Sequence, residues 1–331
     1  MFEKHDRIGG TTSWSGGHVW IPNNPHMAEI GAPDGVEQAM TYLMSLGRGI
    51  VDERLVRAFV ENGPRMAGYL EKHGGVRFFA VPGLPDYYPS HPGGKPHGGR
   101  TMGTELFAFD DLGEWKDRVE TSPYYPGDFR MDETSIGAAV PKPPSPEERA
   151  RRAVRSERGM GQSLIGMLLV ACLREGVEIE SSTPAIDLVV ADGRVRGAVV
   201  EGPGGRRVVR AGRGVVLATV GFEWNLELRA TFLRGVVGMP VSIPTNTGDG
   251  LRMAVKAGSA LQNMREAWWI PATASSPRAR GWSSPTWTAG AAARSSPAWA
   301  RGRCSARRMS GFPTRSATWS PSPSRGSATC T

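Results

Sequence analysis

The chain has 331 residues, which is enough for one large domain or two smaller ones. Its net charge of +8 at pH 7 would suit a nucleic-acid-binding protein, but residues 273–331 contain nine Arg and no Lys, Asp or Glu. The other residues together carry a charge of −1 and offer no basic patch, so the composition predicts no nucleic-acid partner for them.

The spacing of the cysteines and the lengths of the apolar runs exclude further classes of protein. Cys172, Cys304 and Cys330 have neither the spacing of metal ligands nor that of a disulfide framework. No apolar run reaches the roughly 18 residues of a membrane span, and no segment resembles a secretory signal. We therefore expect a soluble cytoplasmic protein with no transmembrane segment and no metal site.

The stretch from Glu3 to Gly17 has the pattern of a strand end followed by a glycine-rich turn. A carboxylate at the end of such a strand accepts two hydrogen bonds from a ribose diol. Two Gly pairs with interleaved Thr and Ser offer backbone N–H groups and hydroxyls to a pyrophosphate or a flavin edge. The spacing alone is equally compatible with a surface loop.

Three core-facing helices are expected next. Asp34 and Asp52 stand where caps of the first two would lie, and Pro64 stands at the first position of the third. We expect these helices to end at Gly47, Gly63 and Gly74.

Residues 76–159 are rich in Pro, Gly and aromatic residues and predict a long, loop-rich insertion. It contains the pair Tyr87-Tyr88 between Pro85-Asp86 and Pro89. The pair belongs either to an active site or to the packing of a proline-rich loop. The Arg- and Glu-rich end of the insertion, residues 147–158, predicts a solvated linker helix.

The second half of the chain changes from helical to strand periodicity. Residues 162–175 predict an apolar helix, and Asp192-Gly193 predicts a hairpin turn. The expected strands are 177–179, then 185–190, 195–201 and 207–210 as a three-stranded meander, and 214–219 as a final buried strand. A helix follows over residues 251–260, for which Asn246 or Asp249 is either an ordinary cap or part of a site.

Four segments together carry a resemblance to a known family: Glu3-Lys4 through Gly16-Gly17 with Val19-Trp20-Ile21-Pro22-Asn23-Asn24, Ala218-Thr219-Val220-Gly221-Phe222-Glu223-Trp224-Asn225, Thr245-Asn246-Thr247-Gly248-Asp249-Gly250, and Glu266-Ala267-Trp268-Trp269-Ile270-Pro271. The chain resembles the FAD-dependent oxidoreductases that include 3-ketosteroid dehydrogenases and, more distantly, the fumarate reductase and succinate dehydrogenase flavoprotein subunits. The resemblance implies an α/β fold, a Rossmann-like FAD-binding domain with a parallel sheet, helices and a three-stranded β-meander.

The resemblance also implies cofactor-binding residues. It places Glu3 on the adenosine ribose and Ile186 at the adenine. The residues expected to line the rest of FAD are Gly9, Gly10, Thr11, Thr12, Ser15, Gly16, Gly17, Ala218, Thr219, Gly221, Phe222, Asn225, Asn246, Gly248, Asp249 and Gly250. Val220 stands where the family has Gly. If that turn needs a positive φ or a close approach, a β-branched residue costs about 1–3 kcal/mol; the alternative is a small rearrangement of the turn.

The implied reaction removes two hydrogens from adjacent ring carbons. A hydride passes to the flavin N5 and a proton to a tyrosinate of depressed pKa, while hydrogen-bond donors polarise the substrate ketone. Tyr87 or Tyr88 matches the family's catalytic tyrosine, and Tyr87 is preferred. The expected substrate is a 3-ketosteroid or similar cyclic ketone, and the electron acceptor is not identified. The alternative is a fumarate reductase-like flavoprotein with another substrate.

The expected division is residues 1–75 and 160–265 as two parts of the FAD-binding domain, 76–159 as the insertion, 266–272 as the start of a substrate domain and 273–331 as a disordered tail. The first βα unit with G-x-G-x-x-G has no counterpart, so we expect weakened FAD binding. The tail has no Leu, Ile or Val, which favours a reading-frame shift over a natural RNA-binding tail. We expect a fragment of impaired or no activity; the alternative is a non-catalytic remnant with a basic tail.

Overall fold

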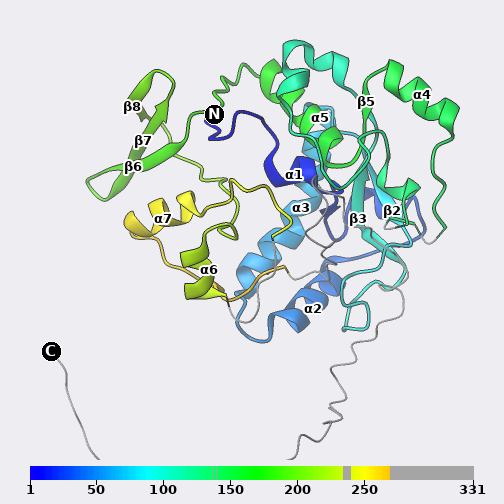
Figure 1. The fold of residues 1–331 in the computed structure, drawn as a ribbon. Coiled ribbons are helices and arrows are strands. Elements are labelled where there is room, and N and C mark those ends of the chain that lie inside the picture. Colours follow the sequence, from blue (N-terminus) through cyan, green and yellow to red (C-terminus); the bar gives the residue numbers. More distant parts are fainter. Residues whose placement is uncertain (136, 139, 234–239, 269–331) are drawn as a thin grey trace, which may run out of the picture. The chain divides into compact units, whose positions relative to one another are not determined.

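The computed structural model describes residues 1–135, 137–138, 140–233 and 240–268 (Figure 1). The start of the expected substrate domain beyond residue 268, and the whole expected tail, lie outside the described residues. The first part of the chain forms α1 (Gly10–Trp14), β1 (Val19–Trp20), the 3-10 turn η1 (Pro25–Met27), α2 (Val36–Gly47) and α3 (Glu53–Gly74).

The long helix α3 corrects the expectation of two separate helices. Its N-cap is Asp52, whose carboxylate accepts a hydrogen bond of 2.9 Å from the N–H of Arg54, as predicted. Pro64, however, lies inside the helix rather than at the start of another one. Gly63 is buried, and a Cβ there would lie 3.1 Å from Ile21 Cγ2. This glycine therefore serves close packing and does not end a helix.

The predicted cap of α2 is also wrong. Its N-cap is Gly35, with no side-chain hydrogen bond. The carboxylate of Asp34 instead accepts hydrogen bonds from the Asn23 N–H at 3.0 Å and from Arg100, 66 positions further along the chain. A charged long-range partner has replaced the local backbone partner that the sequence pattern suggested.

Residues 76–159 hold more regular structure than predicted. They contain β2 (Phe78–Pro82), β3 (Gly98–Thr104), β4 (Phe107–Ala108), the 3-10 segments η2 (Phe109–Arg118) and η3 (Met131–Glu133), α4 (Pro146–Val154) and β5 (Glu157–Arg158). Strands β1, β3 and β2 form one antiparallel sheet in that order, and β4 pairs with β5. Every residue of β3 is buried, so this insertion is built around a core strand.

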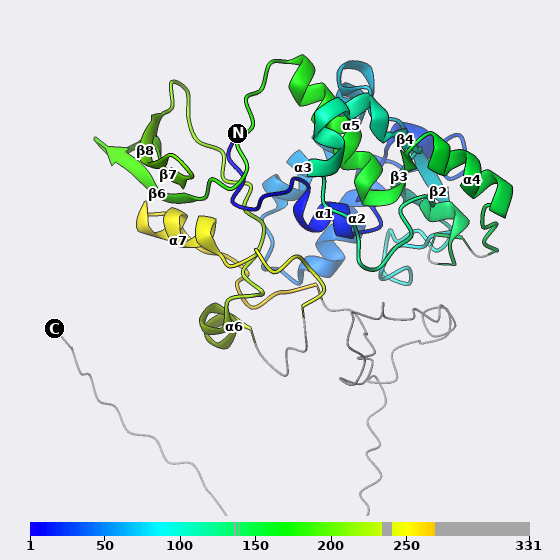
Figure 2. The same cartoon turned by 45° about the horizontal axis from the view of Figure 1, so that its top comes forward.

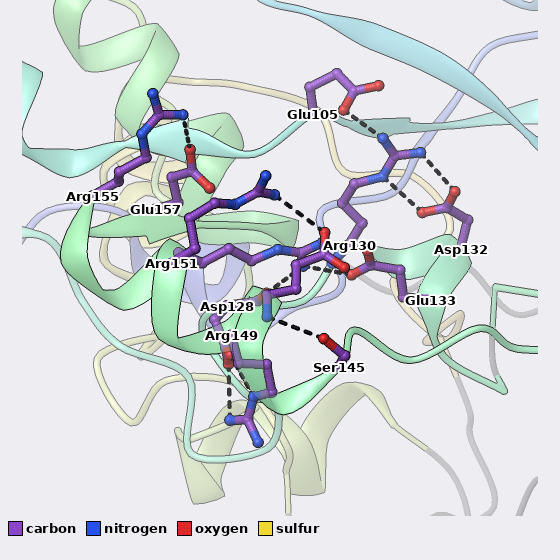
Figure 3. A network of polar contacts seen from close by, with 12 residues as sticks. Glu105, Asp128, Arg130, Asp132, Glu133, Ser145, Arg149, Arg151, Arg155 and Glu157 are labelled. Carbon is purple, nitrogen blue, oxygen red and sulfur yellow. Dashed lines mark hydrogen bonds and ion pairs between the residues drawn. The ribbon is translucent and has the colours of Figure 1, made fainter.

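Helix α4 is exposed over most of its length, as expected for a solvated helix, but ion pairs anchor it to the rest of the insertion. Arg152 is only 3% exposed and donates to Glu133 Oε1 at 2.6 Å and to Glu148 Oε1 at 2.7 Å. Around it, Arg149 pairs with Asp128, and Arg130 joins Glu105 and Asp132 (Figure 3). Because one arginine of this network is buried between two carboxylates, the network ties α4 to η3.

Helix α5 (Met160–Arg174) confirms the predicted apolar helix, which begins two residues earlier than expected. Its apolar side chains belong to the main core together with residues of α3, β2, β3, η2 and the segment before α1: Ile8, Ile21, Ala67, Val76, Phe78, Met102, Phe107, Phe109, Leu112, Val119, Leu164, Met167 and Leu169. α5 also packs on α1, where a Cβ at Gly161 would lie 1.7 Å from the carbonyl oxygen of Thr12. Only glycine permits this approach.

The predicted meander is confirmed as the antiparallel sheet β6 (Ala185–Ala191), β7 (Arg194–Gly202) and β8 (Gly205–Arg210). Asp192 and Gly193 form its first turn with φ of 51° and 68°, the conformation of a tight hairpin. Two helices follow, α6 (Leu226–Phe232) and α7 (Asp249–Lys256). α7 lies alongside β6 in both views, where Lys256 pairs with Asp187 (Figures 1 and 2).

The expected parallel sheet does not form among the described residues. Their strands pair antiparallel, and parallel pairing is confined to two isolated bridges, Phe2 with Glu180 and Ile8 with Val119. Residues 177–179 and 214–219 are not strands, and Val216 is 91% exposed where a buried strand was expected. A strand needs a neighbour for its backbone hydrogen bonds, and no described segment pairs with residues 214–219.

Candidate functional site

The expected glycine-rich turn contains the short helix α1. Gly9, Gly10 and Gly17 have φ of 116°, 51° and 67°, the left-handed region that glycine adopts without strain. A Cβ at Gly17 would lie 2.5 Å from the nitrogen of Gly161 in α5. The glycines therefore let the chain turn into and out of α1 while α1 packs against α5.

Asn246 joins the first and third of the predicted cofactor-binding segments. Its Nδ2 donates to Thr11 Oγ1 at 3.0 Å and to Glu223 Oε1 at 2.7 Å. The backbone carbonyl oxygen of Asn246 accepts a hydrogen bond from the N–H of Trp224 at 3.1 Å, and the side chain of Asn246 is buried. One buried amide thus holds together segments that lie more than 200 positions apart in the sequence.

Lys4 provides a second connection that sequence analysis missed. Its Nζ donates to Thr247 Oγ1 and to Asp249 Oδ2, both at 2.6 Å, and Thr247 also donates to the other oxygen of Asp249 at 2.9 Å. The signal was its position next to Glu3 in the opening motif. The carboxylate of Asp249, expected at the cofactor, is therefore neutralised by a residue of the chain itself.

The glycines of residues 245–250 make room for residues 219–222. A Cβ at Gly250 would lie 1.9 Å from Thr219 Oγ1, and one at Gly248 would lie 2.8 Å from Phe222 Cβ. The N–H of Gly248 donates to the carbonyl of Gly221 at 3.1 Å. The N-cap of α7 is Gly248, with no side-chain cap, so the alternative that Asn246 or Asp249 is an ordinary cap is wrong.

Asn225 takes a structural position. Its Oδ1 accepts from the N–H of Leu228 at 3.0 Å and caps α6, while its Nδ2 donates to the carbonyl of Thr247 at 3.2 Å. Both ends of the amide are therefore used within the protein, and Asn225 connects the second and third segments.

Val220 adopts the backbone conformation that favours glycine. Its φ is 59° and its side chain is 73% exposed. A β-branched residue is strained in this region, and its exposed side chain gains little packing in return. Of the two sequence-based alternatives, the structure agrees with the first, in which the turn requires a positive φ.

Glu3 lies close to the segment that leads into β6. Its carbonyl accepts from the N–H of Thr183 at 2.9 Å, and its own N–H donates to the carbonyl of Glu180 at 2.8 Å. Its Oε1 accepts from the N–H of His5 at 2.8 Å. Ile186, at the start of β6, is 37% exposed. The structure thus brings together the two regions that the resemblance assigns to ribose and adenine.

Three buried polar atoms beside α1 have no hydrogen-bond partner among the described residues: Ser13 Oγ, Trp14 Nε1 and His18 Nε2. Burial lowers the pKa of His18 to about 4, so its ring is neutral at pH 7. Buried polar groups are normally paired, because each unpaired one costs about 1–3 kcal/mol. Residues 13–18 therefore retain hydrogen-bonding capacity that fits a polar ligand. Sequence analysis missed these three side chains, although Ser13 and Trp14 lie inside the first segment it quoted and His18 directly follows that segment.

Tyr87 and Tyr88 stand on a loop with their rings 68% and 55% exposed. The Tyr87 ring meets the edge of Trp268 at a centroid distance of 4.9 Å, and the Tyr88 ring meets His91 at 5.5 Å. Desolvation raises the pKa of Tyr87, and a hydrogen bond with Trp268 opposes this rise only in part. In this structure the pKa of Tyr87 therefore lies above its ordinary value, whereas the resemblance implies a depressed pKa for a catalytic tyrosine.

The tyrosine pair is not joined to the cofactor segments. Among the described residues, no hydrogen bond or ring contact links Tyr87 or Tyr88 to residues 3–17, 218–225 or 245–250. The structure thus assembles the predicted cofactor residues into one cluster and leaves the predicted catalytic pair on a separate loop.

Three glycine-containing segments converge beside unpaired buried polar atoms, an arrangement that suits the binding of an extended polar cofactor. Residues 1–281 match the family model described as FAD binding domain. The chain therefore belongs to the FAD-binding domain family, a family of FAD-dependent dehydrogenases acting on CH–CH bonds, and FAD is the cofactor that this membership implies.

Curated relatives and a solved structure agree with this assignment. The chain is 35% identical over 294 residues to 3-oxosteroid 1-dehydrogenase of Mycobacterium tuberculosis and 37% identical over 278 residues to 4-oxocyclohexanecarboxylate 2-dehydrogenase of Sinomonas cyclohexanicum, with 82% of this chain covered in each case. It matches 52% and 47% of these proteins, so it spans about half the length of the curated relatives.

The crystal structure of 3-ketosteroid delta1-dehydrogenase from Sterolibacterium denitrificans, in complex with 1,4-androstadiene-3,17-dione, superposes with a TM-score of 0.73 at 32% identity. The match covers 82% of this chain and 52% of that one. Within the residues that the structure describes, no helix is both long and apolar enough to cross a membrane.

Proposed function

We propose that the chain is part of an FAD-dependent dehydrogenase that introduces a double bond next to the ketone of a cyclic substrate, either a 3-oxosteroid or a smaller oxocyclohexane. The observation that carries the proposal is the cluster joined by Asn246 and Lys4, in which segments from both ends of the described chain meet. The similarity to dehydrogenases of both substrate classes at 35% and 37% identity supports it.

The proposal divides the work among the chain's own residues. Ser13, Trp14 and His18 would offer their unpaired hydrogen-bonding atoms to the cofactor, and Asn246 keeps the neighbouring segments in place. The resemblance adds Glu3 on the ribose, Ile186 at the adenine, and the residues named above from the three glycine-containing segments as the rest of the lining. When bound, FAD supplies the acceptor for two electrons that dehydrogenation of a CH–CH bond requires.

Tyr87 is the proposed substrate-contacting side chain, with Tyr88 as the alternative. Because its pKa is raised, the Tyr87 hydroxyl is protonated at neutral pH. In this state it donates a hydrogen bond, which suits polarisation of a ketone rather than removal of the α-proton. A role as base requires a cation beside the phenol, and none of the described charged groups lowers its pKa.

The division of the chain into parts remains a proposal as well. Residues 1–75 and 160–265 would form the cofactor domain, and residues 76–159 the insertion that carries the tyrosines. The bridge between Phe2 and Glu180 and the bond between Thr11 and Asn246 support joining the first two ranges.

The test is the visible spectrum of the purified chain after addition of FAD and desalting. Retained flavin bands support the cofactor site, and bleaching of these bands under anaerobic conditions by a 3-oxosteroid or by 4-oxocyclohexanecarboxylate identifies the substrate class. Succinate tests the fumarate reductase-like alternative. Thr11→Val, which removes an acceptor of Asn246, should weaken flavin retention, whereas Thr41→Val on the exposed face of α2 should not. A colourless protein contradicts the proposal.

A second candidate is a flavin-binding chain without turnover. The positive φ of Val220 favours it, because the resemblance places a glycine, which takes this conformation without strain, at this position of the cofactor segment. Retained flavin that none of the three substrates reduces would support this candidate.

A further inference from the structure

The loop that carries Tyr87 and Tyr88 is attached to the core by a buried ion pair. Arg100, in the middle of the buried strand β3, has a side chain that is 0% exposed. Its Nε and Nη2 donate to the two oxygens of Asp34 at 2.8 and 2.9 Å, and its Nη1 donates to Asp86 Oδ2 at 2.9 Å. Asp86 directly precedes Tyr87 in the chain.

Asp86 uses both oxygens of its carboxylate. Oδ1 accepts from Trp20 Nε1 at 2.9 Å, and Oδ2 accepts from the N–H of Lys95 at 2.9 Å as well as from Arg100. The N–H of Asp86 in turn donates to the carbonyl of Lys95 at 3.0 Å. Asp86 therefore fastens both sides of the loop to one guanidinium.

Aromatic rings enclose the same guanidinium. The Arg100 Cζ lies 5.1 Å from the ring centroid of Tyr42 and 5.7 Å from that of Trp20. The Tyr42 hydroxyl accepts a hydrogen bond of 3.2 Å from the N–H of Tyr88. A Cβ at Gly93 would lie 2.4 Å from the carbonyl oxygen of Gln38, so the loop also runs directly against α2.

The charges of this cluster are balanced. Burial raises the pKa of Asp34, but the hydrogen bonds and charge of Arg100, together with backbone hydrogen bonds from Asn23 and Gly35, outweigh burial and hold the pKa below its ordinary value. Lys95, whose Nζ lies 3.8 Å from Asp34 Oδ1, adds a second positive charge against the two carboxylates. The fixed fork geometry of the Arg100 guanidinium, which donates to both carboxylates, specifies one position for Asp86.

We propose that the buried Arg100–Asp86 pair, backed by Asp34, is a positioning element that sets the backbone of Tyr87 and Tyr88 so that their exposed rings meet substrate. Tyr87 and Tyr88 are exposed, whereas the adjoining Asp86 is buried and held by its hydrogen bonds. A binding site requires side chains that are both accessible to the ligand and fixed in position. The inference rests on the proposed function for the role of the two tyrosines, but not for the positioning itself.

The test is hydrogen exchange of the native chain, followed by mass spectrometry, in Asp86→Asn. The amide of Asn carries no charge and has only one acceptor oxygen, so it cannot accept from Trp20 Nε1 on one side and from Arg100 and Lys95 N–H on the other as the carboxylate does. A peptide spanning residues 83–97 should therefore exchange about tenfold faster while α5 is unchanged. Glu133→Gln, which disturbs the other buried arginine, Arg152, should leave residues 83–97 unchanged. Trp20→Phe, which removes only one hydrogen bond to Asp86, should give a smaller increase and serves if Asp86→Asn does not fold.

Unchanged exchange of residues 83–97, or an increase spread equally over α5, would overturn the positioning role. Activity measurements distinguish a failure of the positioning role from a failure of the proposed function. In a flavin-loaded chain that dehydrogenates a cyclic ketone, Asp86→Asn should lower kcat with little change in KM, as Tyr87→Phe should. If Tyr87→Phe and Tyr88→Phe leave turnover unchanged while Asp86→Asn still speeds exchange of the loop, the positioning stands and the proposed role of the tyrosines fails.

Discussion

The two candidate parts of the site are held in opposite ways. Next to the tyrosine loop, Arg100 forms ion pairs with Asp34 and Asp86, and all three side chains are buried. The cofactor side contains unpaired buried atoms of Ser13, Trp14 and His18, and a valine with positive φ. The chain thus supplies hydrogen-bond partners for the buried charges of the tyrosine loop. On the cofactor side it leaves buried polar atoms unpaired, as a binding site for a polar ligand would.

The largest expected effect comes from breaking the satisfied region. Arg100→Met leaves the carboxylates of Asp34 and Asp86 buried without their cation, so the free energy of unfolding should fall by about 3–5 kcal/mol. Urea denaturation followed by fluorescence measures this. Arg54→Met, which breaks the exposed pair with Asp52, is the control and should leave the midpoint unchanged. A loss below about 1 kcal/mol for Arg100→Met would contradict the difference between the tyrosine loop, with its paired buried charges, and the cofactor side.

The cofactor side should show the stronger pH dependence above pH 4. The pKa of His18 is lowered from 6.5 to about 4, so below pH 6.5 the unfolded chain binds a proton that the folded chain does not. Stability should therefore fall as the pH drops from about 6.5 to 4, by up to roughly 3 kcal/mol. His18→Phe should flatten this part of the curve. The same slope in wild type and His18→Phe would contradict the assignment.

The contact between α1 and α5 gives the next effect. Gly161→Ala places a Cβ 1.7 Å from the carbonyl of Thr12 and should lower the unfolding free energy by about 1–3 kcal/mol through overpacking. Gly68→Ala in α3 has no atom within 4 Å of the added Cβ and should instead raise it by up to about 1 kcal/mol. Thermal denaturation of both variants measures the difference, and equal shifts would refute the close packing of α1.

Relief of strain at Val220 should be the smallest effect. Val220→Gly removes the side chain from a positive φ of 59° and should raise the unfolding free energy by about 1 kcal/mol, since the relief exceeds the entropy cost of glycine. Val216→Gly, at an exposed position without positive φ, is the control and should not stabilise the chain. If both variants lower stability alike, strain at Val220 is absent. Improved flavin retention in Val220→Gly would connect the strain to the cofactor.

Local patterns predicted the elements that depend on neighbouring residues. The meander follows from alternating apolar residues and the Asp192-Gly193 turn, and α5 follows from an apolar run at helical spacing. The Asp52 cap was predicted because cap and recipient lie two positions apart. Pro64 was assigned to a helix start because the sequence does not reveal that Gly63 packs against Ile21. The 214–219 strand was assigned from its apolar composition alone, which specifies no partner strand.

From the sequence alone follow the family and the cofactor that membership implies, because several whole motifs in a fixed order are far more specific than the spacing of single glycines. Only the tertiary structure decided that Asp34 binds Arg100 instead of capping a helix, that Lys4 neutralises Asp249, and that Asp86 anchors the tyrosine loop. The physical reason is that an ionised side chain takes the best charged partner available in space, and distance along the chain carries no record of that partner.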